Sequence, residues 1–369
     1  GQPNFPKDLY SSVENDAAEL TFQMTRNIEV DPELMKRLQK ALGSTDTVEL
    51  VTVIAAYNMV SRFLIALDVN PEDHPPAWWT NDSNKMIRNI QTIIPGIATS
   101  DGAGVKLRRS LGGQNQVRLD PFLMLDEFSS NDPNDYVAGF PAHPHRGFET
   151  VTYMLEGHML HEDHLGNQGH LKTGGVQWMT AGRGIIHSEM PQQVSGAMRG
   201  FQLWINLPAK EKMKAAGYKD IQVEDIPKVD LANGGSVKII AGSFDQDNKE
   251  VRGPIQGITT APLFLDVHLP PGAEFEHRIP KELNAFVYIY EGDLEIGGPM
   301  MPAPKQAAIF LGDGDRLKVK AGSSGAQFIV LAALPLHEPI VQYGPFVMNT
   351  RAEIEQAIDD YQNNRFVIA

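Results

Sequence analysis

Cysteine is absent from the 369 residues of this chain. Its absence excludes disulfide bonds, thiolate metal ligands and thiol nucleophiles, so any bound metal must be held by His, Asp or Glu side chains. A chain without cysteine is compatible with a reducing compartment. We therefore expect a cytoplasmic protein, or a nuclear one if the host is eukaryotic.

Positive charge is scarce, because 32 Lys and Arg residues stand against 46 Asp and Glu residues and give a net charge of -14 at pH 7. Such a chain repels phosphate backbones at long range, and no basic cluster stands out in the sequence. We expect no direct nucleic-acid partner.

Long uncharged apolar runs are also missing. The longest apolar stretch, residues 48–69, contains Glu49, Asn58 and Arg62 and is typical of an amphipathic helix rather than a membrane span. No basic, apolar leader opens the sequence, so neither export nor membrane insertion is expected. The hydrophobic content of 42% over 369 residues is enough for two or three domain-sized cores.

Residues 10–68 follow the helical period and predict three α-helices. In the second, Asp31 is the expected N-cap, Pro32 occupies the first helical position and Gly43 marks the end. The third is expected to begin at a capping box formed by Asp46 and Glu49. Its predicted apolar face consists of Val48, Val51, Ala55 and Met59.

Prolines interrupt the helical period in residues 70–95, which predicts a linker with room for one short helix at residues 83–94. Short apolar alternations punctuated by Gly and Pro follow, and these are typical of an all-β sandwich or barrel. Two of them, around residues 149–159 and 284–296, run into a Glu-Gly turn, which predicts two copies of one β unit. Thr350 and Glu353 predict the start of a closing helix.

The spacing of two pairs of residues predicts a metal site. His143 and His145 lie two residues apart on an expected strand, so their imidazoles share one face, and His187 and Glu189 repeat this spacing behind a glycine-rich turn. Brought together in a barrel, three imidazoles and one carboxylate form a ligand set suited to a first-row divalent ion.

Other polar residues are given lesser roles. Four further histidines are expected in a solvated hairpin loop between the two motifs rather than at a second metal site, namely His158, His161, His164 and His170. Arg146 and Arg183 adjoin the motifs and could either attract an anionic substrate or form structural ion pairs. The second β unit has only His268, His277 and His337, without the paired spacing, and is expected to hold no metal.

Four segments of the chain resemble signatures of the pirins, a family of the cupin superfamily: HPHRGFETV, QWMTAGRGIIHSEMP, RLDPFLMLDEF and YGPFVMNTRAEIEQAI. The resemblance covers residues 97–369. It implies a mainly β, bicupin fold, with an N-terminal α-helical module at residues 1–95, a metal-binding cupin at 96–225 and a metal-free cupin with a closing helix at 226–369.

The same resemblance implies a mononuclear iron site. Its ligands by motif would be His143, His145, His187 and Glu189, with Fe²⁺ the expected metal and other first-row divalent ions possible. Glu149 is a ligand position in many cupins, but the pirin pattern passes that role to Glu189. We expect Glu149 to lie behind the ligands or to be structural.

Residues 15–75 resemble the later helices of the carboxymuconolactone decarboxylase and alkylhydroperoxidase D-like group. Members with peroxidase activity use a pair of cysteines that this chain lacks, so inherited thiol chemistry is excluded. Helices of this kind commonly pair between subunits. We expect a homo-oligomer, most simply a dimer through residues 31–68.

Two function classes remain open at this point. The first is an Fe(II) dioxygenase that cleaves a small aromatic substrate, a flavonol such as quercetin, with Glu189 as the candidate base and Glu149 in reserve. The second is an iron-dependent, redox-sensing regulatory or transcriptional cofactor protein without turnover. The ligand residues do not separate the two.

Overall fold

The computed structural model describes residues 11–26, 30–66, 86–113, 117–246 and 249–367. The chain divides into two compact units, residues 1–84 and residues 85–369, the first helical and the second built mainly from β-strands. Within the described ranges, no helix combines the length and apolarity needed to cross a membrane.

The helical unit contains three α-helices packed around a small apolar core. The predicted signals of the second helix are confirmed, since the Asp31 carboxylate accepts a hydrogen bond from the Glu33 backbone N–H and Gly43 ends the helix at a φ of 82°. The core residues are Leu20, Leu34, Leu38 and Ile54. The helices are α1 (Ser12–Arg26), α2 (Pro32–Leu42) and α3 (Ser44–Ala66).

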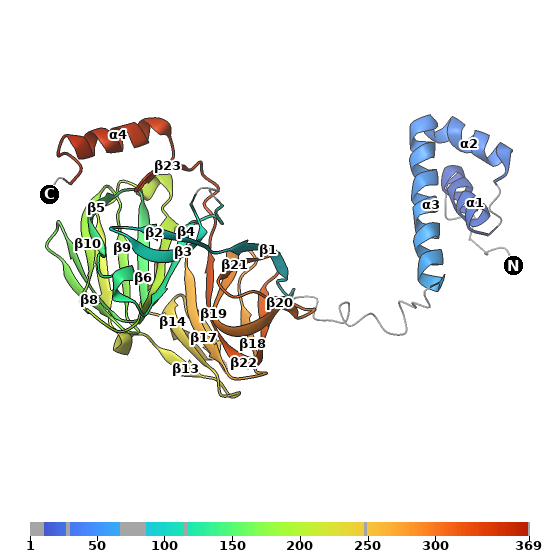
Figure 1. Ribbon diagram of the computed structural model, residues 1–369. Helices are drawn as coiled ribbons and strands as arrows, with labels where there is room; N and C mark the ends of the chain where they lie inside the picture. The colour runs from blue at the N-terminus through green and yellow to red at the C-terminus, as the bar shows by residue number, and fades with distance from the viewer. Residues whose placement is uncertain (1–10, 27–29, 67–85, 114–116, 247–248, 368–369) are drawn as a thin grey trace. The chain divides into compact units, whose positions relative to one another are not determined.

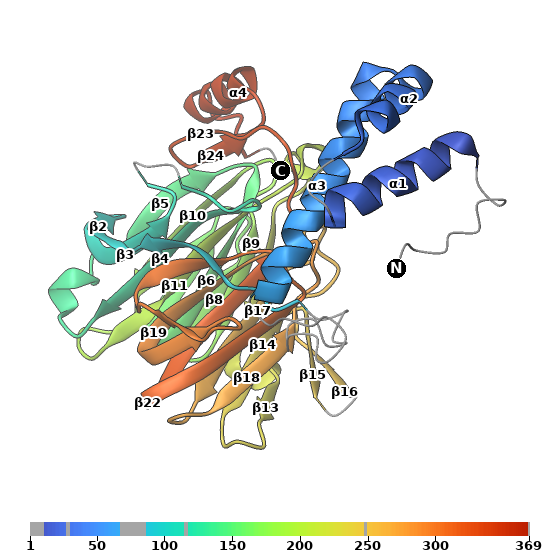
Figure 2. The same cartoon turned by 90° about the vertical axis from the view of Figure 1, so that its right-hand side faces the viewer.

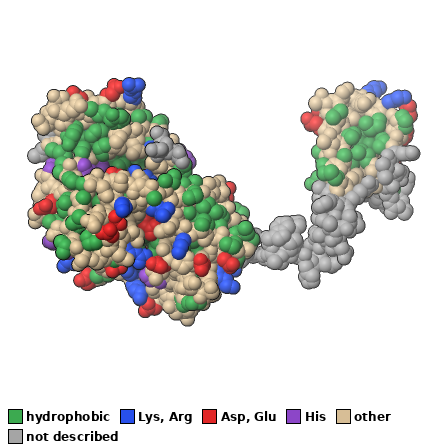
Figure 3. Space-filling model, viewed as in Figure 1, with side chains coloured by type: hydrophobic (Ala, Val, Ile, Leu, Met, Phe, Trp, Pro, Cys, Tyr) green, Lys and Arg blue, Asp and Glu red, His purple; other side chains and the backbone are tan. Residues whose placement is uncertain are grey.

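Helix α3 departs from its prediction in two ways. It begins at Ser44, directly after α2, and not at the predicted capping box. Its buried side runs through Thr47 and Ile54, whereas Val48 is 64% and Met59 69% exposed. Of the predicted apolar face, Val51 packs against the core of this unit, whereas Val48, Ala55 and Met59 are exposed, so apolar side chains remain on the surface. Figure 3 shows hydrophobic side chains gathered on one face of this unit.

The first barrel consists of a seven-stranded and a four-stranded antiparallel sheet. The seven-stranded order is β12-β9-β6-β11-β4-β3-β2, and the four-stranded order is β5-β10-β7-β8. The strands are β2 (Ile97–Asp101), β3 (Val105–Leu111), β4 (Phe122–Ser130), β5 (Phe140–His145), β6 (Phe148–Glu156), β7 (His158–Asp163), β8 (Gln168–Lys172), β9 (Val176–Thr180), β10 (Ile185–Pro191), β11 (Met198–Asn206) and β12 (Gly217–Ile221).

The second barrel is one nine-stranded sheet in which the long strands β19 and β22 pair with each other and with most of the others. A small hairpin, β15 with β16, accompanies it. The strands are β1 (Ile90–Pro95), β13 (Lys228–Asp230), β14 (Ser236–Ala241), β15 (Ser243–Gln246), β16 (Lys249–Arg252), β17 (Leu263–Leu269), β18 (Glu274–Arg278), β19 (Asn284–Ile296), β20 (Met301–Ala303), β21 (Ala307–Leu311) and β22 (Arg316–Ala333).

Strand β1 corrects the prediction of a helix at residues 83–94. Residues 90–95 pair antiparallel with β21, with Ile93 opposite Ile309, so they extend the sheet of the second barrel instead of belonging to a linker. The Ile-Gln-Thr-Ile-Ile segment suits a strand because β-branched residues dominate it. Residues 83–85 of the predicted helix lie outside the described residues.

The two barrels share an apolar core. Val151 and Phe201 of the first barrel belong to the same buried cluster as Phe264 and Tyr288 of the second. Figures 1 and 2 show the two groups of strands packed against each other. The mainly β, bicupin architecture predicted from the sequence is therefore confirmed.

The end of the chain returns to the first barrel. Val347 packs in one cluster with Phe148 and Trp204, and in both views α4 lies over the end of the first barrel (Figures 1 and 2). The predicted capping box of Thr350 and Glu353 is confirmed. The elements here are β23 (Val341–Tyr343), β24 (Phe346–Met348) and α4 (Arg351–Gln362), and short 3-10 helices lie at Pro133–Asp135, Ala209–Glu211 and Val223–Asp225.

Candidate metal centre

The pairing of β5 with β10 brings the two histidine motifs together. These strands run antiparallel, with His187 directly opposite His143 and Ile185 opposite His145. Because alternate residues of a strand share a face, His143 and His145 point to the same side as His187. The Nδ1 atom of His143 lies 2.8 Å from the carbonyl oxygen of Pro141, which leaves its Nε2 atom free.

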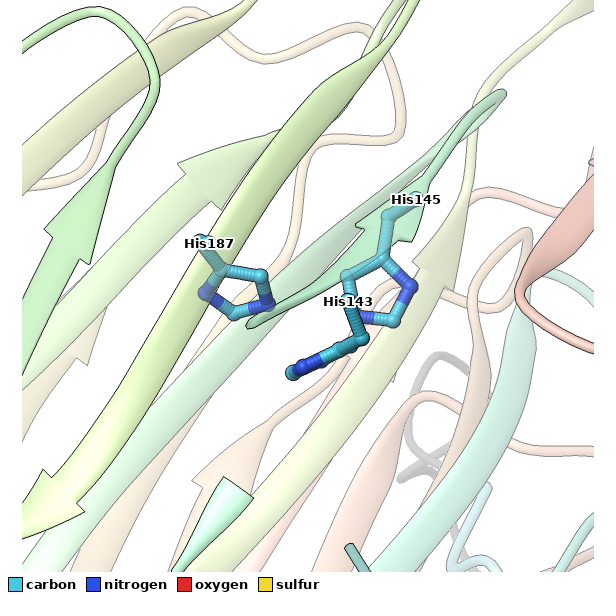
Figure 4. A group of neighbouring side chains, drawn as sticks. All are labelled: His143, His145 and His187. Carbon is cyan, nitrogen blue, oxygen red and sulfur yellow. The ribbon is translucent and has the colours of Figure 1, made fainter. Parts of the chain in front are cut away.

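The three imidazoles face one another, as Figure 4 shows. One ring nitrogen from each of His143, His145 and His187 lies within 4.8 Å of the others. The ring centroids are 4.7 Å apart for His143 and His145, 4.4 Å for His143 and His187, and 5.0 Å for His145 and His187. The structure thus brings together the three histidines that the sequence singled out.

The electrostatics of this cluster favour neutral imidazoles. Burial lowers the pKa of His145 well below its usual range, and the neighbouring His143 lowers it further. Burial and three neighbouring imidazoles likewise lower the pKa of His187. Nδ1 of His145 and Nε2 of His187 are buried and have no hydrogen-bond partner among the described residues. Uncharged ring nitrogens, two of them buried without a described partner, fit a bound metal ion.

Glu189, the fourth predicted ligand, lies beside His187. Its Oε1 accepts a hydrogen bond of 3.0 Å from the Thr152 hydroxyl, and its Oε2 accepts one of 2.9 Å from the Gln202 amide. A carboxylate oxygen of Glu189 lies within 4.8 Å of ring nitrogens of both His187 and His161. Glu189 therefore joins the cluster through His187 and is not grouped with the other two predicted histidines.

Glu149 lies on the opposite face of the large sheet. Its Oε1 accepts a hydrogen bond of 2.6 Å from the Thr180 hydroxyl, and Lys214 is 4.0 Å away. Burial raises the pKa of Glu149, although the Thr180 contact and the Lys214 charge oppose that effect. It lines a separate cavity of about 270 Å3 with Trp178. The structure does not bring Glu149 to the histidines.

His161 corrects the prediction of a solvated loop. It lies on β7, is 1% exposed, and stacks on Tyr218 with ring centroids 4.2 Å apart. Its Nδ1 is 3.3 Å from Nδ1 of His187, and its Nε2 is 3.4 Å from Oδ2 of Asp163. Gly and Asn residues nearby favoured a loop, but the alternation of Met159 with His161 is the strand signal that could have placed it.

The other three histidines of this hairpin lie away from the cluster. His158 and His170 contact each other across β7 and β8, with Nε2 and Nδ1 2.9 Å apart. His164 follows β7 and its Nδ1 accepts a hydrogen bond from the backbone N–H of Ile186. Neither contact includes a third ligand residue, and the two metal-competent groups found among the described residues both contain His187.

A cavity of about 740 Å3 opens onto His143 and His145. Its apolar walls include Met124, Phe140 and Trp204, and its polar walls include Gln202, Arg109 and Arg118. Sequence reasoning gave these residues no role, although Arg118 and Met124 lie in a quoted signature and Phe140 lies on the strand of His143 and His145, because no spacing pattern shows which residues line a cavity. A space of this size matches that of sites for small organic ligands.

The two arginines of the cavity differ in their partners. Arg109 forms ion pairs with Asp101 and Asp126, each at 2.6 Å. Arg118 donates from Nη2 to the side-chain oxygen of Gln342 at 2.5 Å, and within the described ranges no carboxylate forms an ion pair with it. Of the two arginines, Arg118 is therefore the one that has no carboxylate among the described residues to neutralise its charge.

Arg146 resolves one alternative left open by the sequence. Its Nη1 pairs with Oδ2 of Asp360 at 2.8 Å, and its guanidinium lies 4.4 Å from the centroid of the Phe366 ring. Its Nε donates to the backbone oxygen of Arg183. Arg146 is therefore a structural residue that holds the end of the chain against the loop after His145.

The second barrel places its histidines apart. His268 lies on β17 with Nε2 2.9 Å from the Tyr290 hydroxyl, and His277 lies on β18 stacked on Phe244. His337 has a φ of 54° in the segment after β22. The ligand groups of the described chain fall in the first barrel, and the metal-free second barrel stays a prediction.

Comparison with protein families finds two matches in this chain. Residues 104–205 match the Pirin family, and residues 264–367 match the Pirin C-terminal cupin domain. These matches fall on the first and the second barrel. Neither reaches the helical segment, so its resemblance to the carboxymuconolactone decarboxylase group stays a prediction.

Individual proteins give the same pattern. A Pseudomonas aeruginosa protein named "Putative quercetin 2,3-dioxygenase" is 55% identical over 278 residues, covering 75% of this chain and 97% of that protein. A pirin-like protein of Caulobacter vibrioides is 47% identical, covering 76% and 99% of the two chains. The crystal structure of a quercetin 2,3-dioxygenase from Acinetobacter baumannii is 32% identical with a TM-score of 0.69, covering 76% and 98%.

Proposed function

Because this chain belongs to the pirin family, we propose that it is a mononuclear non-haem iron protein that cleaves a flavonol such as quercetin with dioxygen. Similarity to two proteins named as quercetin 2,3-dioxygenases supports the substrate class. The observation that carries the proposal is the cavity of about 740 Å3 that opens directly onto His143 and His145, since it gives a small aromatic molecule access to the ligand set.

The proposed metal ligands are His143, His145, His187 and Glu189. Bound by these residues, iron(II) would supply Lewis acidity and redox chemistry toward dioxygen. The neutral state of the buried imidazoles keeps their lone pairs available. The Gln202 and Thr152 hydrogen bonds restrain the Glu189 carboxylate beside His187.

The cavity walls would orient the substrate. Trp204 and Phe140 offer aromatic faces for flat rings, and Met124 adds an adaptable apolar contact. Arg118, which has no described acidic partner, would hold a hydroxyl or phenolate oxygen of the substrate. Apolar packing with one cationic anchor would fix which ring faces the histidines.

A flavonol hydroxyl must lose a proton before its oxygen can bind as an anion. We assign Glu189 as the base that accepts this proton. Its carboxylate lies next to His187 and accepts a hydrogen bond from Gln202, which lines the cavity. Glu149 was the reserve base, but its place on the other face of the sheet, in a different cavity, offers the substrate proton no path to it.

The test uses full-length protein loaded with iron(II) under anaerobic conditions. Quercetin should bind with a red-shifted absorption band and be consumed only after oxygen is admitted. Glu189→Gln should keep some binding and lose turnover, because the amide cannot accept the proton. Glu162→Gln, at an exposed position of β7, is the matched control and should retain both.

A second outcome would favour the regulatory function. If the iron-loaded protein neither perturbs the quercetin spectrum nor consumes oxygen, the dioxygenase proposal is wrong. Binding of a partner protein that changes with the oxidation state of the iron, without turnover, would then support the redox-sensing function.

A further inference from the structure

Two of the three clustered histidines, His143 and His187, have different kinds of hydrogen-bond partner at Nδ1. Nδ1 of His143 faces the carbonyl oxygen of Pro141 at 2.8 Å. A carbonyl can only accept a hydrogen bond, so Nδ1 of His143 must carry the proton and Nε2 must carry the lone pair. The backbone alone therefore fixes this tautomer.

Nδ1 of His187 faces another imidazole instead of a carbonyl. It lies 3.3 Å from Nδ1 of His161, and an imidazole nitrogen can either donate or accept. Two arrangements are open to this pair. In one, His187 donates and keeps its Nε2 lone pair for a metal; in the other, His187 accepts and its Nε2 carries the proton, which blocks it as a ligand.

The contact made by the other ring nitrogen of His161 decides between these two arrangements. Its Nε2 lies 3.4 Å from Oδ2 of Asp163, and the side chains of both residues are almost completely buried. Both oxygens of Asp163 accept hydrogen bonds, Oδ1 from the backbone N–H groups of Leu165 and Asn167 and Oδ2 from the Asn167 amide, so Asp163 is an acceptor. His161 must then donate from Nε2 to Asp163, which leaves its Nδ1 as the acceptor for His187.

We propose that Asp163 and His161 are positioning residues that fix the tautomer of His187 and so present its Nε2 lone pair to the metal. The inference rests on the metal site of the proposed function but not on its substrate. Nε2 of His187 is buried and has no hydrogen-bond partner in the part of the chain that the structure describes, as this arrangement requires. The donor of each hydrogen bond is set by the previous one: Asp163 can only accept, so His161 donates to it, and His187 then donates to His161.

Two features keep this chain of side chains in place. Oδ1 of Asp163 accepts hydrogen bonds from the backbone N–H groups of Leu165 and Asn167, which anchors the carboxylate in the turn after β7. The His161 ring stacks on Tyr218 at an interplanar angle of 12°, which fixes its plane. His161 can therefore neither rotate freely nor reach solvent.

The decisive measurement uses metal-free wild-type protein and needs no substrate. A long-range proton–nitrogen correlation spectrum of the His187 ring distinguishes a protonated from an unprotonated nitrogen. We expect one tautomer, with the proton on Nδ1. A His187 ring protonated on Nε2, or an even mixture of both forms, would overturn the proposal even if the protein oxidises quercetin.

Variants test the two positioning residues. His161→Phe keeps the stack on Tyr218 but removes the acceptor, and Asp163→Asn keeps the turn acceptor but removes the charge. Both should produce a mixture of His187 tautomers and weaken cobalt(II) binding about 10- to 100-fold in a chelator competition. His158→Phe, on the same strand but in the exposed histidine pair, is the control and should bind cobalt(II) as the wild type does.

The outcomes separate this inference from the proposed function. If both variants keep a single Nδ1 tautomer and wild-type cobalt(II) affinity, the positioning role is refuted. If the variants behave as expected but no flavonol is oxidised, only the proposed function fails. Should His161→Phe not fold, as judged by circular dichroism, Asp163→Asn and the wild-type spectrum still decide the question.

Discussion

Adjacent residues of β6 point to opposite faces of its sheet, and this alternation separates the two glutamates near the metal motifs. Phe148 contacts the His145 ring and Thr152 binds Glu189, so even-numbered positions face the candidate metal centre. Val151 belongs to the core shared by the two barrels, and Glu149 has the same parity. Glu149 is thus separated from the histidines by the sheet itself.

This alternation gives a prediction for metal content. Glu149→Gln should leave the amount of bound metal unchanged, because its side chain meets Thr180 and not the ligands. His187→Ala should abolish metal binding, since it removes the residue common to both ligand groups. Metal analysis of the two purified variants checks both. Loss of metal from Glu149→Gln would contradict the assignment.

A second residue-scale prediction concerns His277 in the second barrel. Burial, with a smaller effect of the Arg316 charge, lowers its pKa from 6.5 to about 4. Between these values the unfolded chain binds a proton that the folded chain does not, so the free energy of unfolding rises with pH across this window. Acidification from 6.5 toward about 4 should progressively remove this contribution.

The variant His277→Phe keeps an aromatic ring against Phe244 and removes the titration. Between about pH 7 and about pH 5, wild-type metal-free protein should lose about 2 kcal/mol more of its unfolding free energy than this variant. Denaturant titrations at the two pH values measure the difference. Parallel losses in the two proteins would show that His277 titrates normally in the folded state.

At the residue scale, spacing predicted part of the centre. His143 with His145, and His187 with Glu189, each lie two apart on a strand, so a period of two was enough to place them on common faces. His161 was missed because its importance depends on β7 pairing with β10, a contact between strands. The tautomer chain through Asp163 is a geometric property that no local pattern encodes.

At the element scale, one buried lysine joins three segments. Nζ of Lys212 donates to the backbone oxygen of Gly147 at 2.8 Å, to Oδ1 of Asn206 at 2.6 Å and to the backbone oxygen of Val347 at 3.0 Å. It links the loop after His145, the end of β11 and β24. The closing segment is therefore fastened to the first barrel close to the candidate metal centre.

Lys212→Met preserves the length of the side chain but leaves three acceptors without their donor. We expect the unfolding free energy to fall by about 2 kcal/mol, because the lost hydrogen bonds outweigh the relief from burying a charge. Lys210→Met, at an exposed position of the short 3-10 helix that ends just before Lys212, is the control and should have little effect. Equal stability of the two variants would refute this role for Lys212.

Elements with strong local sequence signals were predicted correctly, and those that depend on distant partners were not. The caps of α2 and α4 were read correctly because Asp31, Gly43, Thr350 and Glu353 act through hydrogen bonds or backbone preferences within one turn. Strand β1 was missed because its partner β21 is more than two hundred residues away in sequence, as the pairing of Ile93 with Ile309 shows. Tertiary pairing overrode a local pattern that also suited a helix.

At the scale of the whole molecule, the second barrel supports the first without repeating its chemistry. Asp266 of the second barrel is 1% exposed and accepts hydrogen bonds of 2.6 Å from Tyr153 of the first barrel and from Tyr290. Together with the shared apolar core, these contacts cover the back of β6 and β11. The second barrel thereby buries Val151, Tyr153 and Phe201 on the face of the sheet opposite the candidate metal centre.

The helical unit carries the last prediction, a homodimer formed through α3. The core between the three helices is thin, because it contains four buried residues. On one side of α3, Val48 is 64% exposed and Met59 is 69% exposed. Val48→Lys with Met59→Lys should therefore convert a dimer into a monomer in analytical ultracentrifugation.

Deletion of the helical unit tests the same idea from another direction. The cut should follow residue 84, because removal of residues 1–95 would also take β1 from the sheet of the second barrel. Residues 85–369 should then sediment as a monomer, since the apolar side of α3 is gone. A dimer that survives both the deletion and the paired lysine substitutions would place the subunit contact on the barrels, and the helices would need another explanation for their exposed apolar side chains.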